Sequence, residues 1–273
     1  MSDPTSPSTA PIPALLLAAG RGERMRPLTD HTPKPLLQVQ GQPLLQWHLQ
    51  ALAQAGCSQA VINTAWLGEQ IQRHFGHQFA SPHGPVALRY SDEAADFGRA
   101  LETAGGMARA LPQLGPVFWL AAGDVFAPDF VFSPAAVARF QASQALAHLW
   151  LVPNPAHHPH GDFGLSEQGL ALNLPPDAPG PRYTYSTIGL FRAELLAAPW
   201  TELTAGNPSG AVAPLAPLLR RAMDQGRVSA SLYTGRWTDV GTPERLAELN
   251  RPTDSGTSAA PTDLPTPPHQ AAP

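Results

Sequence analysis

The chain has 273 residues, a formal net charge of −4, 43% hydrophobic residues and 14% charged residues. This mildly acidic balance argues against bulk nucleic-acid binding, and no apolar run reaches the roughly 18 to 20 residues that a membrane helix needs. The start of the chain lacks the basic stretch of a secretory signal, and the single cysteine, Cys57, excludes an intrachain disulfide framework. We therefore expect a cytoplasmic protein with neither a membrane nor a nucleic-acid partner.

Both ends of the chain differ in composition from its middle. Residues 1–13 and 251–273 are rich in Pro, Ser, Thr and Ala. Such segments cannot bury enough apolar surface to offset the entropy lost on ordering. We expect two disordered tails, 1–13 and 251–273, on either side of one folded domain over 14–250.

Within 14–250, strand-length apolar runs alternate with amphipathic helical patterns. Strands are expected at 14–18, 60–63, 86–90, 117–121 and 146–152, and helices at 43–55, 67–75, 100–111 and 134–141. This alternation predicts a mostly parallel sheet covered by helices on both faces, with ligands bound beyond the carboxyl ends of its strands. Shorter strands at 163–165, 170–174 and 183–191, then helices at 215–225 and 243–249, predict a smaller mixed part.

The first expected strand leads into a glycine-rich turn. Its sequence is Ala18-Ala19-Gly20-Arg21-Gly22-Glu23-Arg24. Small residues let backbone N–H groups approach a phosphate chain, and the two arginines add positive charge. The turn lacks the third glycine of the dinucleotide-binding pattern and the Gly-Lys-Ser/Thr of a P-loop.

Lys34 is the one lysine among 17 basic residues. It stands between Pro33 and Pro35, and the prolines predict a rigid, extended segment that would hold a compact positive charge at a fixed point.

Taken together, four segments resemble the motifs of the sugar-1-phosphate nucleotidylyltransferases. They are the turn over 17–24, Pro33-Lys34-Pro35, Gly123-Asp124 after the 117–121 strand, and Trp237-Thr238-Asp239-Val240-Gly241-Thr242 before the last helix. The resemblance implies a Rossmann-like, GT-A-like three-layer α/β sandwich with a smaller sugar-binding part. It also implies Mg²⁺-dependent transfer of a nucleotidyl group from a nucleoside triphosphate to a sugar 1-phosphate.

The resemblance also assigns roles to individual residues. Asp124 and Asp239 would hold Mg²⁺, Arg24 would neutralise the departing pyrophosphate, and Lys34 would steer the sugar phosphate or the α-phosphate. The nucleotide would contact Ala18, Ala19, Gly20, Gly22, Glu23, Arg24, Lys34, Thr103, Gly105 and Ala122, and the sugar would contact Asp162, Gly164 and Thr187.

Further segments favour one branch of the family. Residues 101–106 resemble a base-recognition loop, and 65–68 and 157–163 resemble segments of the branch that transfers a uridylyl group from UTP to N-acetylmuramate α-1-phosphate in peptidoglycan recycling. Mannose-1-phosphate guanylyltransferases and glucose-1-phosphate thymidylyltransferases share the four motifs and remain alternatives, as does a catalytically silent subunit that binds nucleotide sugars. Two departures bear on this choice: Ala122 stands where the branch has Asn, and Thr187 stands where relatives carry Gly. A monomer or a small homo-oligomer is expected.

Overall fold

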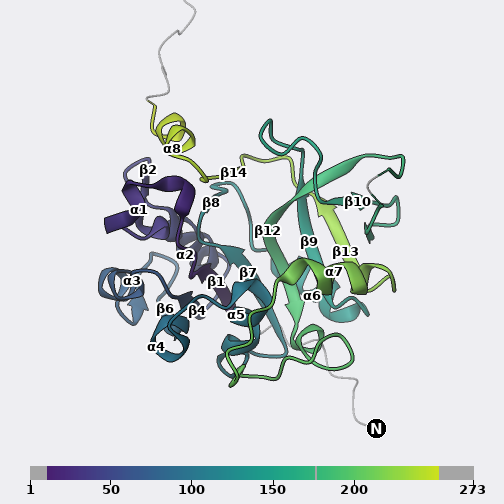
Figure 1. The fold of residues 1–273 in the computed structure, drawn as a ribbon, viewed down its shortest axis with the longest axis horizontal. Coiled ribbons are helices and arrows are strands. Elements are labelled where there is room, and N and C mark those ends of the chain that lie inside the picture. Colours follow the sequence, from purple (N-terminus) through teal and green to yellow (C-terminus); the bar gives the residue numbers. More distant parts are fainter. Residues whose placement is uncertain (1–10, 176, 252–273) are drawn as a thin grey trace, which may run out of the picture.

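The computed structural model describes residues 11–175 and 177–251 (Figure 1). The expected tails therefore lie outside the described residues, except for 11–13 and Arg251. In the described part of the chain, no helix is both long enough and apolar enough to cross a lipid bilayer.

The expected strands and helices form, with small shifts at their ends. The strands are β1 (Ala14–Ala18), β2 (Gln38–Val39), β3 (Gln42–Pro43), β4 (Gln59–Thr64), β5 (Gln78–Phe79), β6 (Val86–Asp92), β7 (Val117–Ala122), β8 (Val125–Phe126), β9 (Ala147–Val152), β10 (Phe163–Leu165), β11 (Ala171–Leu172), β12 (Arg182–Arg192), β13 (Val228–Leu232) and β14 (Thr238–Asp239). The α-helices are α1 (Leu28–His31), α2 (Leu44–Gln54), α3 (Gly68–Phe75), α4 (Glu93–Phe97), α5 (Glu102–Ala110), α6 (Pro134–Ala142), α7 (Leu215–Met223) and α8 (Pro243–Leu249).

The main sheet has a parallel centre, which confirms the expected α/β class. Its order is β11-β10-β12-β7-β1-β4-β6-β5, and β7, β1, β4 and β6 run parallel to one another. Strand β12 is antiparallel to both β7 and β9, and β13 extends β9. The chain runs from β1 to β4 and β6 on one side of β1 and then returns to β7 on the other side. The strand order therefore reverses beside β1, and such sheets bind ligands at this place, at the carboxyl ends of the strands.

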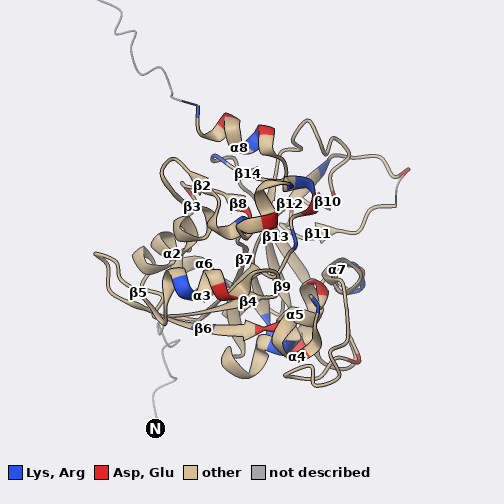
Figure 2. Cartoon of the chain, turned by 60° about the vertical axis from the view of Figure 1, so that its left-hand side comes forward, with Lys and Arg blue, Asp and Glu red and all other residues tan. Residues whose placement is uncertain are grey.

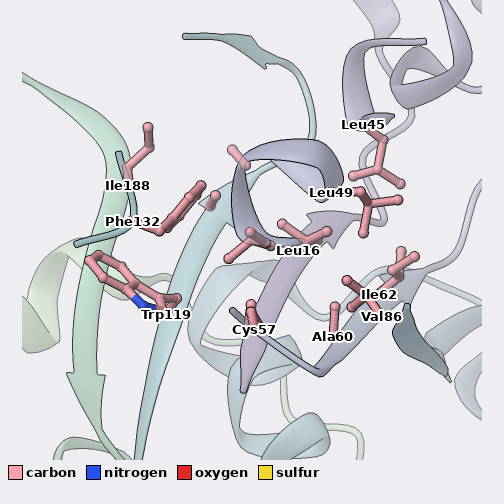
Figure 3. Close-up of a cluster of buried hydrophobic side chains, with 14 of the residues drawn as sticks. Leu16, Leu45, Leu49, Cys57, Ala60, Ile62, Val86, Trp119, Phe132 and Ile188 are labelled. Atoms are coloured by element: carbon pink, nitrogen blue, oxygen red, sulfur yellow. The ribbon is translucent and has the colours of Figure 1, made fainter. Parts of the chain in front are cut away.

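The two main cores follow from the alternation of side chains along the central strands. Leu16 of β1 faces a cluster that includes Leu49 of α2 and residues of α3 and α6 (Figure 3). Its neighbour Leu15 faces the opposite cluster, to which α5 and α7 contribute. The sheet is thus buried on both faces, and the three layers place the strand ends, rather than a sheet face, against solvent.

A third, smaller core ties distant segments together beside the crevice. It contains Met25, Leu37, Val39, Leu44, Phe126 and Val240, with Leu246 and Leu249 of α8 packed against it. Strand β14 pairs with β8 in antiparallel register, so that Asp239 lies opposite Val125. The N–H of Val240 also donates to the carbonyl oxygen of Asp124 at 2.9 Å. This short ladder brings Asp124 and Asp239 to the same place.

The prediction of an extended segment around Lys34 is wrong. Lys34–Leu36 forms a 3₁₀ turn, in which Leu36 N donates to Pro33 O at 2.9 Å and Leu37 N donates to Lys34 O at 3.0 Å. Pro35 fits this first turn because its position needs no N–H donor. The turn leaves Lys34 buried, with 8% of its surface exposed.

His48 of α2 is buried against β8. Its Nε2 lies 2.9 Å from the carbonyl oxygen of Val125, which fits a neutral ring that donates Nε2–H. Burial lowers the pKa of His48 to about 4, and burial together with the nearby Arg139 lowers the pKa of His148 in β9 to about 4. Both rings therefore stay neutral in the folded chain at pH values where they would take up a proton in the unfolded chain.

This difference predicts an acid-dependent loss of stability. The unfolded chain binds a proton at His48 below about pH 6.5, whereas the folded chain binds one only below about pH 4. The free energy of unfolding is therefore highest above pH 6.5 and falls as the pH drops to 4. For this ring the fall amounts to at most about 3 kcal/mol. His48→Gln, which keeps a donor for Val125, should flatten the fall of Tm between pH 6.5 and 4, whereas His83→Gln at an exposed histidine should not. Equal slopes for wild type and His48→Gln would contradict the assignment.

Candidate active site at the carboxyl ends of the parallel strands

The glycine-rich turn after β1 is held by side chains that follow it. Gly22 adopts a φ of +68°, and its carbonyl accepts a hydrogen bond from Thr29 Oγ1 at 2.8 Å. Arg21 pairs with Asp30 at 2.6 Å and lies over the ring of Trp66, 3.8 Å from its centroid. Arg21 therefore braces the turn through these two contacts.

The turn forms one wall of a cavity of about 300 Å³, which we call the loop cavity. Its lining includes Leu17, Ala18, Ala19, Gly20, Gly22, Lys34, Pro35, Asn63, Glu93, Ala100, Glu102, Thr103, Ala122, Asp124 and Thr187. Seven of the ten residues expected to contact the nucleotide are in this set, and they come from the ends of β1 and β7, the Lys34 turn and the start of α5.

The other three expected nucleotide contacts lie elsewhere. Glu23 is exposed outside the loop cavity, and Arg24 is exposed at a neighbouring cavity. Gly105 lies in α5 with its N–H donating to Ala213 O at 3.1 Å, and a Cβ on it would come within 2.6 Å of Ala211 O. Gly105 thus allows α5 to pack closely against the 211–213 backbone, behind the cavity.

A buried hydrogen-bond network joins the turn to the start of α5. Ala18 N donates to Asn63 Oδ1 at 2.7 Å, Asn63 Nδ2 donates to Glu93 Oε1 at 2.8 Å, and Leu101 N donates to Glu93 Oε2 at 2.7 Å. Burial raises the pKa of Glu93, although the two donated hydrogen bonds favour its ionised form. Because every group is paired, the network holds β1, β4 and the 101–103 segment in one arrangement.

The second cavity is mostly apolar and has a volume of about 340 Å³. We call it the apolar cavity; it is lined by Leu17, Glu102, Thr103, Leu120, Asp162, Phe163, Tyr185, Thr187, Pro214, Leu215, Ala216 and Leu219. Asp162 Oδ2 accepts a hydrogen bond from Tyr185 N at 2.8 Å, and its Oδ1 lies 3.1 Å from His158 Nε2. Gly164, an expected sugar contact, is outside this lining. A Cβ on it would come within 2.6 Å of Leu174, so the glycine allows close packing there.

The third cavity contains both expected metal ligands and has a volume of about 330 Å³. We call it the two-aspartate cavity; its lining is Arg24, Asp124, Val125, His157, His158, Thr184, Tyr185, Thr187, Trp237 and Asp239. Lys34 Nζ donates to Asp124 Oδ2 at 2.6 Å, and Arg24 has no ion-pair partner among the described residues. Charged residues of both signs lie around β10, β12 and β14 (Figure 2).

Asp239 has an oxygen that suits a metal ion. Its Oδ1 lies 2.6 Å from Arg245 Nη1 and 2.8 Å from His157 Nε2, yet no donor in residues 11–175 and 177–251 is aligned to hydrogen-bond it. The same residues contain no cluster of three or more His, Cys, Asp or Glu that could hold a metal. Two carboxylates completed by phosphate oxygens and water are what Mg²⁺ typically uses, so the donor set of Asp124 and Asp239 fits a nucleotide-bound divalent ion.

Two side chains at this site were missed by the motifs. Asn63 is the penultimate residue of β4, and a polar residue near the end of an apolar strand is the only signal that the sequence offers for its place at the crevice. Arg245 follows Thr242-Pro243, the cap of α8, so the first turn of this helix reaches back to the carbonyl oxygen of Asp239 at 2.9 Å. Neither residue could be assigned without knowing which segments meet.

Comparisons with known proteins define the class. Residues 13–255 match the family of nucleotidyl transferases, and the chain belongs to this family. It is 48% identical over 242 residues to the N-acetylmuramate alpha-1-phosphate uridylyltransferase of Neisseria meningitidis, covering 86% of this chain and 95% of that one. It is 31% identical over 254 residues to the enzyme of the same name from Caulobacter vibrioides, covering 88% and 99%.

Solved structures share the fold at lower identity. A crystal structure assigned to a glucose-1-phosphate thymidylyltransferase from Bacillus anthracis superposes with a TM-score of 0.72 at 20% identity, over 91% of this chain and 98% of that one. The inositol-1-phosphate CTP transferase of T. maritima gives a TM-score of 0.63 at 18% identity, over 89% and 98%. These likenesses confirm the expected Rossmann-like nucleotidyltransferase fold.

The Asn63–Glu93 network depends on the absence of a side chain at Gly106. A Cβ there would contact Glu93 Oε1 and would lie 2.8 Å from Asn63 Nδ2. Gly→Ala inside a helix normally stabilises by up to about 1 kcal/mol. Gly106→Ala should instead destabilise by about 1–3 kcal/mol through overpacking and should weaken the binding of a nucleoside triphosphate. Thermal unfolding and calorimetric titration measure both, with Gly115→Ala, whose Cβ would meet nothing closer than 3.8 Å, as the control. A stabilised Gly106→Ala variant would contradict the role of the network.

Proposed function

We propose that this chain transfers the uridylyl group of UTP to N-acetylmuramate α-1-phosphate, with release of pyrophosphate, in peptidoglycan recycling. The observation that carries this proposal is the meeting of Lys34, Asp124 and Asp239, with Arg24 beside them, at the junction of the loop and two-aspartate cavities. The choice of uridylyl and of N-acetylmuramate rests on the two relatives of that name, which this chain matches over 95% and 99% of their lengths.

The reaction needs alignment and charge neutralisation more than a base. An oxygen of the sugar 1-phosphate is already anionic, and it forms a bond to the α-phosphorus of UTP while the bond to the pyrophosphate oxygen breaks. We infer that backbone N–H groups of the turn after β1 hold the phosphate chain, as N–H groups in such turns do. Arg24, exposed at the mouth of the two-aspartate cavity, neutralises the departing pyrophosphate.

Lys34 is placed to act on a reacting phosphate. Its ammonium group lies 2.6 Å from Asp124 and lines the loop cavity, and its stem is buried by the 3₁₀ turn. A compact charge held at a fixed point can neutralise one phosphate oxygen without the space that a guanidinium would need. This accounts for one lysine in a chain that otherwise uses arginine.

Asp124 and Asp239 would hold a divalent cation, Mg²⁺ in this proposal. When bound, the ion supplies positive charge to the reacting phosphate oxygens. The β8–β14 ladder brings Asp124, which precedes β8, and Asp239 of β14 to one cavity, and Asp239 Oδ1 accepts no aligned hydrogen bond, as described above.

The loop cavity and the apolar cavity suit the nucleobase and the sugar, respectively. Thr103 and the start of α5 would contact the nucleobase, and the apolar cavity with Asp162 would take the sugar. We further propose that 14–250 forms the catalytic unit. A silent nucleotide-sugar-binding subunit is disfavoured because Arg24, Lys34, Asp124 and Asp239 are all in place around joined cavities.

Pyrophosphate release tests the proposal directly. The expected preference is for UTP with N-acetylmuramate α-1-phosphate over GTP with mannose 1-phosphate and over dTTP with glucose 1-phosphate, each with Mg²⁺. Chelation of the divalent ion should abolish turnover, and its return should restore it. Preference for another pair would keep the class of reaction and change the substrates, whereas no turnover with any pair would favour the silent subunit.

A further inference from the structure

Thr187 combines a β-branched side chain with a left-handed backbone. Its φ is +61°, a conformation that is a genuine outlier for such a residue. Backbone strain of this kind persists only where the surroundings impose it, and it tends to gather at binding sites. Glu102, another non-glycine residue with φ of +61°, also lines the loop and apolar cavities. Gln40, Leu67 and Asn207, with φ of +52°, +51° and +41°, line none of the three cavities.

The strain arises in a bulge of β12. Tyr185 pairs with Leu151 and Gly189 pairs with Leu149, so four steps along β12 face two steps along β9 and the chain between them arches out. Thr187 lies at the centre of this arch.

Hydrogen bonds from both sides of the site lock the bulge. On one side, Tyr185 N donates to Asp162 Oδ2 at 2.8 Å. On the other side, Ser186 O accepts from Trp237 Nε1 at 3.1 Å and from Thr187 Oγ1 at 2.6 Å. The bulge is therefore fixed between the aspartate of the apolar cavity and the segment that leads into Asp239.

The arch places Thr187 at the meeting point of the site. Among the described residues, it is the one that lines the loop, apolar and two-aspartate cavities together. Its hydroxyl proton is already donated to Ser186 O, so the side chain contributes mainly bulk to the walls of these cavities.

We propose that Thr187 is a specificity-determining residue: its side chain, held out by the locked bulge of β12, forms the partition between the three cavities and sets which sugar 1-phosphates fit against it. This inference rests on the proposed function for the identity of the acceptor. The partition acts through the volume of the Thr187 side chain. The gain or loss of a methyl-sized group in the wall of a binding cavity changes the discrimination between two substrates by about 10-fold or more.

Thr187→Gly removes the partition and relieves the strain at once. We expect its Tm to rise by a few degrees, about 2–4 °C. We also expect the preference for N-acetylmuramate α-1-phosphate over glucose 1-phosphate to fall by about 10-fold. The KM for UTP should change less than this preference, because the turn after β1 and the Lys34 site keep their own contacts.

Two further variants separate strain from specificity. Gln40→Gly relieves a left-handed conformation at a residue that lines none of the three cavities, and should raise Tm without changing the preference. Thr187→Ala keeps the Cβ and removes the methyl and hydroxyl groups, and should show an intermediate preference even if Thr187→Gly folds poorly.

The preference is measured in two ways, as the ratio of kcat/KM values and as the ratio of calorimetric affinities for the two sugar 1-phosphates in the presence of a non-hydrolysable UTP analogue. Unchanged ratios in both Thr187 variants would overturn the inference, whatever their Tm. A wild-type protein that binds the sugar phosphates but turns over neither would count against the proposed function instead, and the affinity ratios would still decide the role of Thr187.

Discussion

The β8–β14 ladder is the contact on which the site depends. It consists of two short strands from distant parts of the chain, in which Asp239 lies opposite Val125 and Val240 N donates to Asp124 O. So short a pairing is not stable by itself in water. It is supported by the third core, in which Val240 and Phe126 pack with Met25 and the residues of α8. The fold thus uses a small apolar cluster to bring two carboxylates of like charge to one cavity.

The same ladder positions residues on either side of it. Trp237, just before β14, donates to Ser186 in the bulge of β12, and Arg245, just after it in α8, reaches the carbonyl of Asp239. The bulge of β12 beside the apolar cavity and the two-aspartate cavity are consequently both positioned by the β8–β14 ladder. Asp124 pairs with Lys34, Asp239 lies against Arg245, and Asp162 lies against His158. Asp124 and Asp239 are thereby compensated by cations from other elements, the Lys34 turn and α8, which limits the cost of gathering these carboxylates in a partly buried crevice.

Much of the fold follows from local sequence, whereas the site follows only in part. Apolar runs predict β1, β4 and β7, and leucine spacing predicts α2, because each element buries its own face. The two-residue strands β8 and β14 have no periodicity to detect, so the meeting of Asp124 and Asp239 came from family resemblance alone. The 3₁₀ turn at Lys34 and the packing of Gly105 against 211–213 depend on partners remote in the chain. The left-handed backbone of Thr187 has the same origin, since the bulge is imposed by Asp162 and Trp237.

The sharing of one divalent ion by Asp124 and Asp239 is the central claim, and a double-mutant cycle on the binding of UTP with and without Mn²⁺ tests it most directly. The increase in UTP affinity that Mn²⁺ confers should fall by about 10-fold or more in Asp124→Asn and in Asp239→Asn. The double variant should lose little more than either single one, because both oxygens act on the same ion. Asp129→Asn, at an exposed aspartate paired with Arg236, should leave the increase unchanged. Independent, additive losses, or an undiminished effect of Mn²⁺ in Asp239→Asn, would contradict the account.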